Sequence, residues 1–273
     1  MEKILAYFFS DKLAFMYFPR NTNLPMFVSS KAALIQILFT NYYFSRVMEN
    51  SNKIQLLSRM PILAPLQPSE IEQLANATQF KKINRFHFIY MPDEKSEYLY
   101  FLLKGKIKIG TFSLDGREVI KEILQPEQPF GDMALAGETK RGDFAQAMGE
   151  EVEILAVRMA DFRQMMQSNP QLMFSCLQHL NQRLSRVEER LASLVLKDAR
   201  ERIIEFLLDS AGREGRKVGY ETLVKHQLTQ QEIANLTGTS RQTVTSVLND
   251  LRKSNLIYFN RNSILIRDIQ RLA

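Results

Sequence analysis

One group of polar residues in this 273-residue chain has the types and the spacing needed to bind nucleic acid. It lies near the C-terminus in the stretch LTGTSRQTVT, where Arg241 and Gln242 follow two hydroxyl residues. Arginine can form two hydrogen bonds with guanine, and glutamine can form two with adenine. Hydroxyl groups and the N-terminus of a helix suit phosphate oxygens. The residues that we expect to contact DNA are Thr229, Gln230, Thr239, Ser240, Arg241, Gln242, Thr243, Thr245 and Ser246.

The residues around this stretch have the pattern of a helix-turn-helix unit. Thr229 and Glu232 form a capping-box pattern that begins a first helix. Gly238 supplies the positive φ that ends this helix, and Thr239 or Ser240 begins the second one. The expected inner face of the second helix consists of Val244, Val247, Leu248 and Leu251. An ordinary αα-hairpin with a solvated polar surface is the alternative. The stretch NLIYFNRNSILIRD, which predicts two short strands, favours a winged helix instead.

A heptad repeat of apolar residues precedes this unit. From Met173 the spacings alternate between four and three over about three heptads, which is the a/d pattern of a dimeric coiled coil. The expected dimer seam consists of Leu177, Leu180, Leu184, Val187, Leu191 and Leu194. In a parallel dimer, Arg183 at a g position would face Glu188 at the following e position of the partner. The alternative is a single helix that packs on its own β domain.

The region between residues 80 and 157 has a β pattern. Lysine and isoleucine alternate from Lys106 to Ile109, and Asp115-Gly116 is a tight-turn signal between two such runs. Gly105 within a strand pattern predicts a bulge or a close approach of another backbone. Many short strands separated by turn residues predict a sandwich or jelly roll.

The bulk composition limits the class of protein. The net charge is +6 and the pI is about 9.3, with most of the excess charge in residues 197–273, which favours an anionic partner there. Cys176 is the only cysteine, so one chain cannot form a disulfide framework, and a reducing, cytoplasmic setting fits. No run of eighteen apolar residues predicts a membrane span. Because no nucleophile–base pair, phosphate loop or group of histidines occurs, we expect neither catalysis nor a metal site.

Together these stretches resemble the CRP/FNR superfamily of bacterial transcription regulators. The resemblance rests on LTQQEIANLTGTSRQTVTSVLNDLRKSNLI, on YLYFLLKGKIKI, and on PFGDMALAGETKRGDFAQA, and it covers about residues 54–272. It implies an α+β fold with three parts. These are a double-stranded β-helix (jelly roll) of the cyclic-nucleotide-binding type at 48–170, a dimerisation helix at 171–196 and a winged helix-turn-helix at 197–273. It also implies a homodimer on a two-fold DNA site, with RNA polymerase as a frequent partner.

Residues 1–47 are not explained by the resemblance. They hold eleven of the twenty-seven aromatic residues without a sustained helical or strand period. We expect an extension outside the main fold that arises from a start codon assigned too early. The alternative is a hydrophobic docking or membrane-surface segment.

The resemblance also suggests an effector pocket. Cyclic-nucleotide binders of the family carry a cassette that reads F-G-E, then A/G-L, then R-S/T-A, and two hydroxyl residues on the dimer helix that face the adenine. The matching residues here are Gly131, Asp132, Arg141, Gly142, Asp143, Val187 and Glu188. Arg141 suits a phosphate, but Asp132 is one methylene shorter than glutamate, Gly142 lacks the hydroxyl, and Asp143 adds a like charge. The two dimer-helix residues replace the hydroxyls. We therefore expect no binding of cyclic AMP and assign no other cofactor. The alternative role for Arg141 is an ion pair with Asp132 or Asp143.

Other effectors of the family are restricted by composition. Iron–sulfur sensors need several cysteines, and we expect Cys176 to pack as a small apolar residue beside the seam rather than to sense redox state. A haem would need an axial histidine, for which His87, predicted in a strand, and His179, on the dimer helix, are the candidates.

The recognition helix departs from the family pattern as well. Arg241 matches the family's arginine, but Gln242 replaces a glutamate and Ser246 replaces a second arginine. We therefore predict a half-site other than TGTGA. The alternative function is a cyclic-nucleotide-responsive signalling module that acts elsewhere than on DNA. The winged helix after the dimer helix favours the transcription regulator.

Overall fold

The structure is a computed structural model that describes residues 50–226, 228–260 and 263–272. Contacts within the chain define a compact unit over Glu49–Ala273, to which these residues belong. The extension predicted at residues 1–47 lies outside the described residues.

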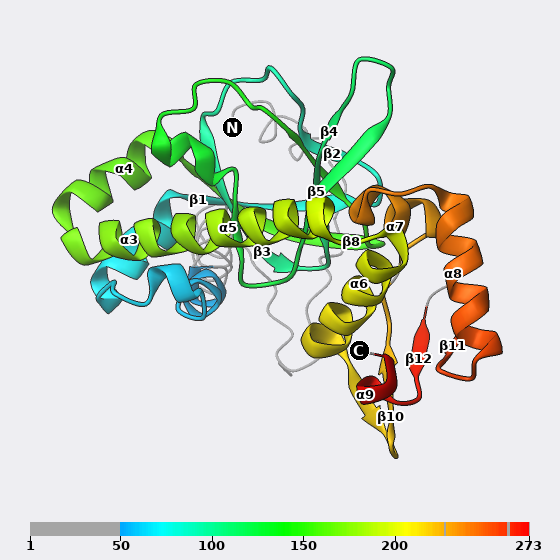
Figure 1. The fold of residues 1–273 in the computed structure, drawn as a ribbon. Coiled ribbons are helices and arrows are strands. Elements are labelled where there is room, and N and C mark those ends of the chain that lie inside the picture. Colours follow the sequence, from blue (N-terminus) through cyan, green and yellow to red (C-terminus); the bar gives the residue numbers. More distant parts are fainter. Residues whose placement is uncertain (1–49, 227, 261–262, 273) are drawn as a thin grey trace, which may run out of the picture. The chain divides into compact units, whose positions relative to one another are not determined.

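The first part of this unit is a β-sandwich preceded by short helices. Residues 50–57 are helical. The elements that follow are η1 (Pro61–Leu63), α3 (Pro68–Ala77), β1 (Thr78–Asn84), β2 (Phe88–Tyr90), β3 (Tyr98–Lys104), β4 (Ile107–Phe112), β5 (Glu118–Leu124), β6 (Pro129–Phe130), η2 (Asp132–Ala136), β7 (Phe144–Ala147) and β8 (Glu151–Arg158). They form two four-stranded sheets with the orders β1-β8-β3-β6 and β2-β7-β4-β5, and the paired strands are antiparallel (Figure 1). The predicted sandwich is confirmed.

Apolar side chains fill the space between the two sheets. Ile107 and Ile109 of β4 point into this core together with Leu102 and Ile154. Each fully buried side chain of this size contributes about 1.5–3 kcal/mol to folding. Lys108, between the two β4 isoleucines, points to the other face of the sheet, as the alternation predicted. Lys108 is nevertheless buried, because a helix of the C-terminal part covers that face.

Two glycines in this region adopt a positive φ that the local backbone requires. Gly116 has a φ of +79° and ends the turn between β4 and β5, where its N–H donates to the carbonyl of Ser113. Gly105 has a φ of +86°, and a Cβ there would lie 2.8 Å from the carbonyl oxygen of Glu151. The predicted close approach of another backbone at Gly105 is therefore confirmed.

A long helix follows the sandwich. After α4 (Met159–Ser168), the helix α5 (Pro170–Leu196) begins at Asn169, whose side chain accepts hydrogen bonds from the N–H groups of Gln171 and Leu172. It runs along the sandwich, and α6 (Ala199–Glu214) leaves its end in a different direction (Figure 1). Asp198 caps α6 by a capping box with Glu201.

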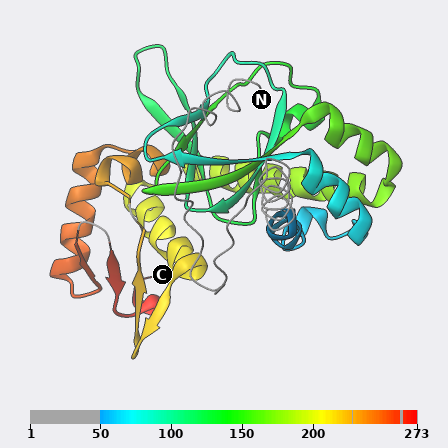
Figure 2. The same cartoon turned by 180° about the vertical axis from the view of Figure 1, so that it is seen from behind.

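The C-terminal part combines helices with a small sheet. Its elements after α6 are β9 (Arg216–Val218), β10 (Glu221–Val224), α7 (Gln230–Thr237), α8 (Arg241–Lys253), β11 (Ile257–Phe259), β12 (Ile264–Ile266) and α9 (Ile269–Leu272). The strand order is β11-β12-β10-β9, and β11 and β12 are the two strands predicted for the wing (Figure 2). The helix α6 extends to Glu214 and accommodates Gly212, where a Cβ would meet no atom within 4 Å.

None of the helices among the described residues is long and apolar enough to cross a membrane.

Candidate functional site

The helix-turn-helix unit forms as its local signals predict. Thr229 and Glu232 make a capping box at the start of α7, and Gly238 ends this helix with a φ of +62°. The Oγ of Ser240 then accepts a hydrogen bond from the N–H of Thr243 at 3.0 Å and caps α8. Between the alternatives Thr239 and Ser240, the structure therefore selects Ser240. The inner face of α8 is buried and consists of Val244, Val247, Leu248 and Leu251.

The polar residues of α8 lie on its other side. Arg241, Gln242 and Ser246 are exposed near the N-terminal end of the helix, and we call them the recognition face. Thr245 is half-buried, and its hydroxyl donates to Oε1 of Gln230 at 2.6 Å. This bond ties the first helix to the second beside the recognition face. None of the described residues therefore covers Arg241, Gln242 or Ser246.

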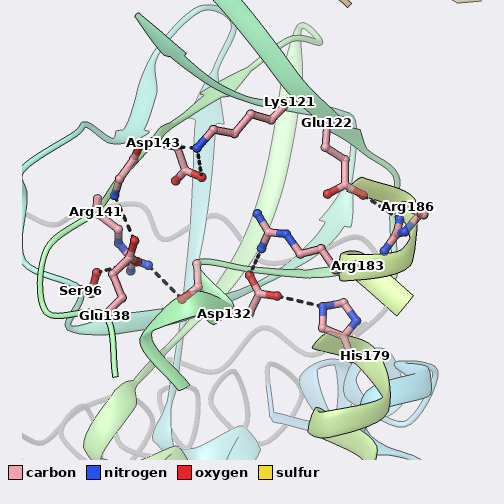
Figure 3. A network of polar contacts seen from close by, with 12 residues as sticks. Ser96, Lys121, Glu122, Asp132, Glu138, Arg141, Asp143, His179, Arg183 and Arg186 are labelled. Atoms are coloured by element: carbon pink, nitrogen blue, oxygen red, sulfur yellow. Dashed lines mark hydrogen bonds and ion pairs between the residues drawn. The ribbon is translucent and has the colours of Figure 1, made fainter. Parts of the chain in front are cut away.

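A second polar cluster lies where α5 passes the β-sandwich (Figure 3). The Asp132 carboxylate is fully buried, and it accepts hydrogen bonds from Nε2 of His179 at 3.0 Å and from Nη1 of Arg183. Burial opposes its ionisation, but the hydrogen bond from His179 and the charge of Arg183 outweigh burial. The pKa of Asp132 therefore lies below its usual value.

Arg183 also has a partner within its own chain. Its side chain is 21% exposed, and its charge is paired with the buried Asp132. Arg183 thus connects α5 to η2, and the pair with Glu188 of a second chain stays a prediction. Sequence spacing on the helix alone could not reveal this contact, because Asp132 is 51 positions away.

Arg141 is a structural residue of the sandwich. Its Nη1 donates to the carbonyl of Gly131 at 2.9 Å, and its Nη2 donates to the carbonyl of Tyr98. The guanidinium carbon lies 4.4 Å from the ring centroid of Tyr90. Burial raises the pKa of Tyr90 well above its usual value, so this ring is neutral. The alternative in which Arg141 pairs with Asp132 or Asp143 is wrong, because its donors bind carbonyl groups.

Gly131 makes this arrangement of Arg141 sterically feasible. A Cβ at position 131 would lie 2.8 Å from Nη1 of Arg141, and the φ of Gly131 is +70°. Among the described residues, the buried Nε of Arg141 is a donor without a hydrogen-bond partner. The other two nitrogens of the guanidinium are used within the chain.

The remaining residues of the predicted cassette, Gly142 and Asp143, also bind side chains of this protein (Figure 3). Glu138 accepts a hydrogen bond from the N–H of Gly142 at 3.1 Å, and its other oxygen accepts one from Ser96 at 3.3 Å. Asp143 pairs with Nζ of Lys121 at 3.4 Å. A carboxylate therefore lies at the amide that follows the matched arginine, where an anionic ligand would be repelled.

Little space remains at this cluster. A pocket of about 10 Å³ is lined by Tyr90, Ile109, Glu122, Leu124, Gln128, Pro129, Phe130, Gly131, Asp132, His179, Arg183 and Arg186. This volume is about that needed for one water molecule, whereas small-molecule sites usually measure about 300–1,000 Å³. Val187 and Glu188 are exposed on α5 and lie outside this lining, so their place in an effector pocket stays a prediction. The helix instead contributes residues that sequence reasoning missed, namely His179, Arg183 and Arg186.

A larger cavity of about 350 Å³ lies between β5, α5, α6 and the end of α7. Three of its arginines are bound within the chain. Arg186 pairs with Glu122 at 2.7 Å, and Arg190 and Arg202 donate to backbone carbonyls. These arginines link elements of the fold across the cavity wall.

The apolar stripe of α5 is exposed in the single chain. Leu177, Leu184, Val187, Leu191 and Leu194 are between 42% and 61% exposed, and Leu180 is half-buried. Together they form what we call the dimer stripe. Exposed apolar side chains in a continuous row indicate a surface that another molecule covers.

Cys176 is packed in the interior of the protein, and His87 is exposed. Cys176 is buried in the apolar core between α5 and the sandwich, as predicted, and burial together with the charge of Asp132 raises the pKa of its thiol to about 11. His87 lies in the turn between β1 and β2 rather than in a strand, and it is exposed. No group of three or more potential metal ligands occurs in the part of the chain that the structure describes.

The fold and these two regions define a class of protein in which a β-sandwich of the cyclic-nucleotide-binding type is joined by a long helix to a winged helix-turn-helix. Comparison with known families agrees. The cyclic nucleotide-binding domain family matches residues 80–169, and the Crp-like helix-turn-helix domain family matches residues 201–273.

Individual relatives extend this result. Over 219 residues the chain is 33% identical to the CRP-like cAMP-activated global transcriptional regulator of Mycobacterium tuberculosis, which spans 80% of this chain and 97% of the relative. It is 29% identical to the global nitrogen regulator of Nostoc over 65% of this chain and 80% of that protein. A CooA mutant from Carboxydothermus hydrogenoformans has a similar structure, with a TM-score of 0.62 and 26% identity over 72% of this chain and 87% of that one.

The chain belongs to the CRP/FNR family of bacterial transcription regulators, and its C-terminal part is a DNA-binding helix-turn-helix. The resemblance stated from the motifs is therefore confirmed, and so is the α+β fold. Members of the family regulate transcription rather than catalyse reactions, which confirms the expectation that the chain is not an enzyme.

Proposed function

We propose that this protein is a homodimer that recognises a two-fold DNA site in a sequence-specific manner and regulates transcription without binding cyclic AMP. The observation that carries the proposal is the exposed recognition face of α8, a helix whose opposite face is buried. Val244, Val247 and Leu251 fix α8 against the rest of the unit, while Arg241 and Gln242 remain exposed. Such a helix can enter the major groove with its N-terminal residues at the base edges.

The recognition face suggests a division of roles. Arg241 contacts guanine and Gln242 contacts adenine, and each bidentate pair discriminates against the wrong base by about 1–3 kcal/mol. The hydroxyl-bearing residues and amides at the two helix starts contact phosphates, and these are Thr229, Gln230, Thr239, Ser240, Thr243 and Thr245. Ser246 takes the place of an arginine, so the half-site differs from TGTGA.

The dimer stripe supports the homodimer. An a/d row from Leu177 to Leu194 on one face of α5 buries itself best against the same row of a second copy. A two-fold protein then matches a two-fold site whose half-sites lie about 34–36 Å apart. RNA polymerase is the further partner that this proposal includes, and the cytoplasm is its compartment.

The closed pocket supports the loss of cyclic AMP binding. The mycobacterial relative is cAMP-activated according to its name, and we propose that this chain differs from it. Asp132 is bound by His179 and Arg183, and Arg141 donates to carbonyls. A nucleotide would have to break these contacts and displace Glu138 from Gly142. Each buried group that lost its partner would cost about 1–3 kcal/mol.

Two measurements on the full chain test the proposal. Selection from a random duplex pool is expected to return a two-fold sequence, and binding to it is expected to weaken steeply with salt. Calorimetric titration with cyclic AMP is expected to give no heat. Recovery of no consensus sequence would contradict DNA recognition, and micromolar binding of cyclic AMP would contradict the closed pocket.

A further inference from the structure

Arg190 on α5 joins three elements of the fold. Its Nη2 donates to the carbonyl of Ile120 at 2.8 Å and to the carbonyl of Leu236 at 2.6 Å, and its Nη1 donates to the carbonyl of Lys121. Ile120 and Lys121 belong to β5, and Leu236 lies in the last turn of α7. One half-buried guanidinium therefore connects the dimer helix, the β-sandwich and the first helix of the helix-turn-helix.

Arg190 contacts α7 at the C-terminal end of this helix, where backbone carbonyls lack hydrogen-bond donors within the helix. The last carbonyls of an α-helix have no partner within the helix and carry the negative end of its dipole. Arg202 of α6 covers the next two carbonyls, with Nε on Thr237 at 2.8 Å and Nη2 on Gly238 at 3.2 Å. Two arginines from different helices thus hold three consecutive carbonyls at the end of α7.

The outer side of α7 is held by a second contact with the sandwich. Nζ of Lys108 lies 2.6 Å from Glu118 and 3.7 Å from Glu232, and the lysine side chain is 8% exposed. Asn235 also donates to Glu118, at 3.2 Å. The β4–β5 hairpin, which carries Glu118, projects on the side of α7 and α8 in both views (Figures 1 and 2). The first helix is therefore fixed at more than one point along its length.

We propose that Arg190 is a positioning residue for DNA recognition, because it fixes each helix-turn-helix to the dimer helix and thereby sets the distance between the two recognition helices. The proposal rests on the homodimer of the proposed function. In such a dimer, α5 is the element shared by both halves, so an arginine that ties α7 to α5 also ties one recognition helix to the other. Arg190 itself does not touch DNA.

Loss of the Arg190 contacts should weaken binding only to DNA that contains two half-sites. Without Arg190, the contacts of α7 with Lys108 and Glu118 remain, but the direct connection of α7 to α5 is lost. Each helix-turn-helix then moves more freely about the connection at Lys197 and Asp198, and binding of the second half-site must restrict this added motion. The effective concentration of the second recognition helix then falls. We expect the affinity for a two-fold site to decrease about tenfold, while the affinity for a single half-site is unchanged.

The test compares full-length variants on matched duplexes. Arg190→Ala removes the contacts, and Arg200→Ala is the charge-matched control, since Arg200 is an exposed cation at the start of α6. The duplexes are the selected two-fold site, the same site with one half-site scrambled, and versions whose half-sites are shifted by one or two base pairs. Fluorescence anisotropy gives the Kd for each protein and duplex.

Relative to Arg200→Ala, Arg190→Ala is expected to bind the two-fold site about tenfold more weakly, while its Kd for the half-site stays within twofold. We also expect its affinity to differ less between the selected site and the sites with shifted half-sites. Arg190→Lys keeps the charge but cannot reach carbonyls on both elements at once, so it serves as the second variant if Arg190→Ala does not fold. Equal losses on both duplexes, or no loss, would overturn the proposal. If the unmodified chain selects no duplex, the proposed function fails. If it selects one and the variants behave like the control, only the role of Arg190 is contradicted.

Discussion

Gly238, in the turn of the helix-turn-helix, lies against Leu194 at the end of α5: a Cβ at position 238 would be 2.8 Å from Cδ2 of Leu194. The φ of Gly238 is +62°, in the left-handed region. Leu194 can move, but an alanine would keep the unfavourable φ. We therefore expect Gly238→Ala to lower the free energy of unfolding by about 1–2 kcal/mol. Urea denaturation measures this change.

Gly212 supplies the matched control. It lies inside α6, its φ is not positive, and a Cβ there would meet no atom within 4 Å. Gly212→Ala is expected to raise the free energy of unfolding by about 0.5–1 kcal/mol. If both variants changed stability in the same direction, the conformational argument for Gly238 would be wrong.

The recognition face predicts a change in base preference. Gln242→Ala is expected to relax preference at one base pair of each half-site, because the bidentate contact with adenine is lost. Each half-site would lose about 1–3 kcal/mol of discrimination at that position. Binding to a set of single-base substitutions measures it. Lys253→Ala, at the other end of α8, is the control and should leave all base preferences as they are. An unchanged preference profile for Gln242→Ala would exclude the proposed contact.

The dimer stripe predicts a separable effect on oligomeric state. Leu184→Glu places a carboxylate at the expected seam, and we expect a monomer at micromolar concentration by light scattering. Leu184 is 55% exposed in one chain, so the fold should persist in the far-UV circular dichroism spectrum. Gln182→Glu, on an exposed position away from the stripe, should remain a dimer. A dimeric Leu184→Glu protein would show that the seam lies elsewhere.

We expect Asp132 to contribute to the free energy of unfolding in a way that depends on pH. Its pKa in the folded protein lies below the usual 3.8, because His179 and Arg183 favour the ionised form despite burial. The unfolded chain therefore takes up the proton first, and the stabilisation present above about pH 5 is lost as the pH falls through 3.8 toward the folded pKa.

The pH dependence can be assigned by substitution. Asp132→Asn is expected to flatten the decline of unfolding free energy between pH 5 and about pH 3, measured by urea titration at each pH. Asp250→Asn removes an exposed carboxyl on α8 and should leave the decline as it is. A slope that is the same in all three proteins would contradict the assignment to Asp132.

We expect the thiol of Cys176 to react slowly with thiol reagents in the folded protein. Because the pKa of the thiol is about 11, roughly one thousandth is ionised at pH 8, and the side chain is buried. Ellman's reagent should modify the folded protein far more slowly than the urea-unfolded chain, which releases one equivalent. Complete reaction of the folded protein within seconds would contradict the packed role and favour a redox sensor.

The helix-turn-helix could be predicted from sequence because its determinants are local. Thr229 with Glu232, Gly238 and Ser240 act within three or four residues of their partners. The apolar face of α8 follows from helical periodicity alone. The same holds for the turn at Gly116 and for the a/d row of α5.

The polar contacts between elements could not be predicted in this way. His179 and Asp132 are 47 positions apart, and Arg190 and Leu236 are 46 apart. Lys108 alternates with apolar residues as an exposed lysine would, and its burial depends on Glu232 of α7. A family motif singled out Arg141, but its partner Tyr98 depends on how η2 and β3 pack. Of the predicted pocket residues, Gly131 and Asp132 line the pocket, whereas the lining that α5 contributes could not be read from the sequence.

The most direct test of the account is the affinity of the full chain for its selected two-fold duplex, measured by fluorescence anisotropy with and without saturating cyclic AMP. We predict binding at least about 10³-fold tighter than to a scrambled duplex. We also predict a Kd that cyclic AMP leaves within twofold. Equal affinity for both duplexes, or a Kd that tightens tenfold or more when cyclic AMP is added, would contradict the account.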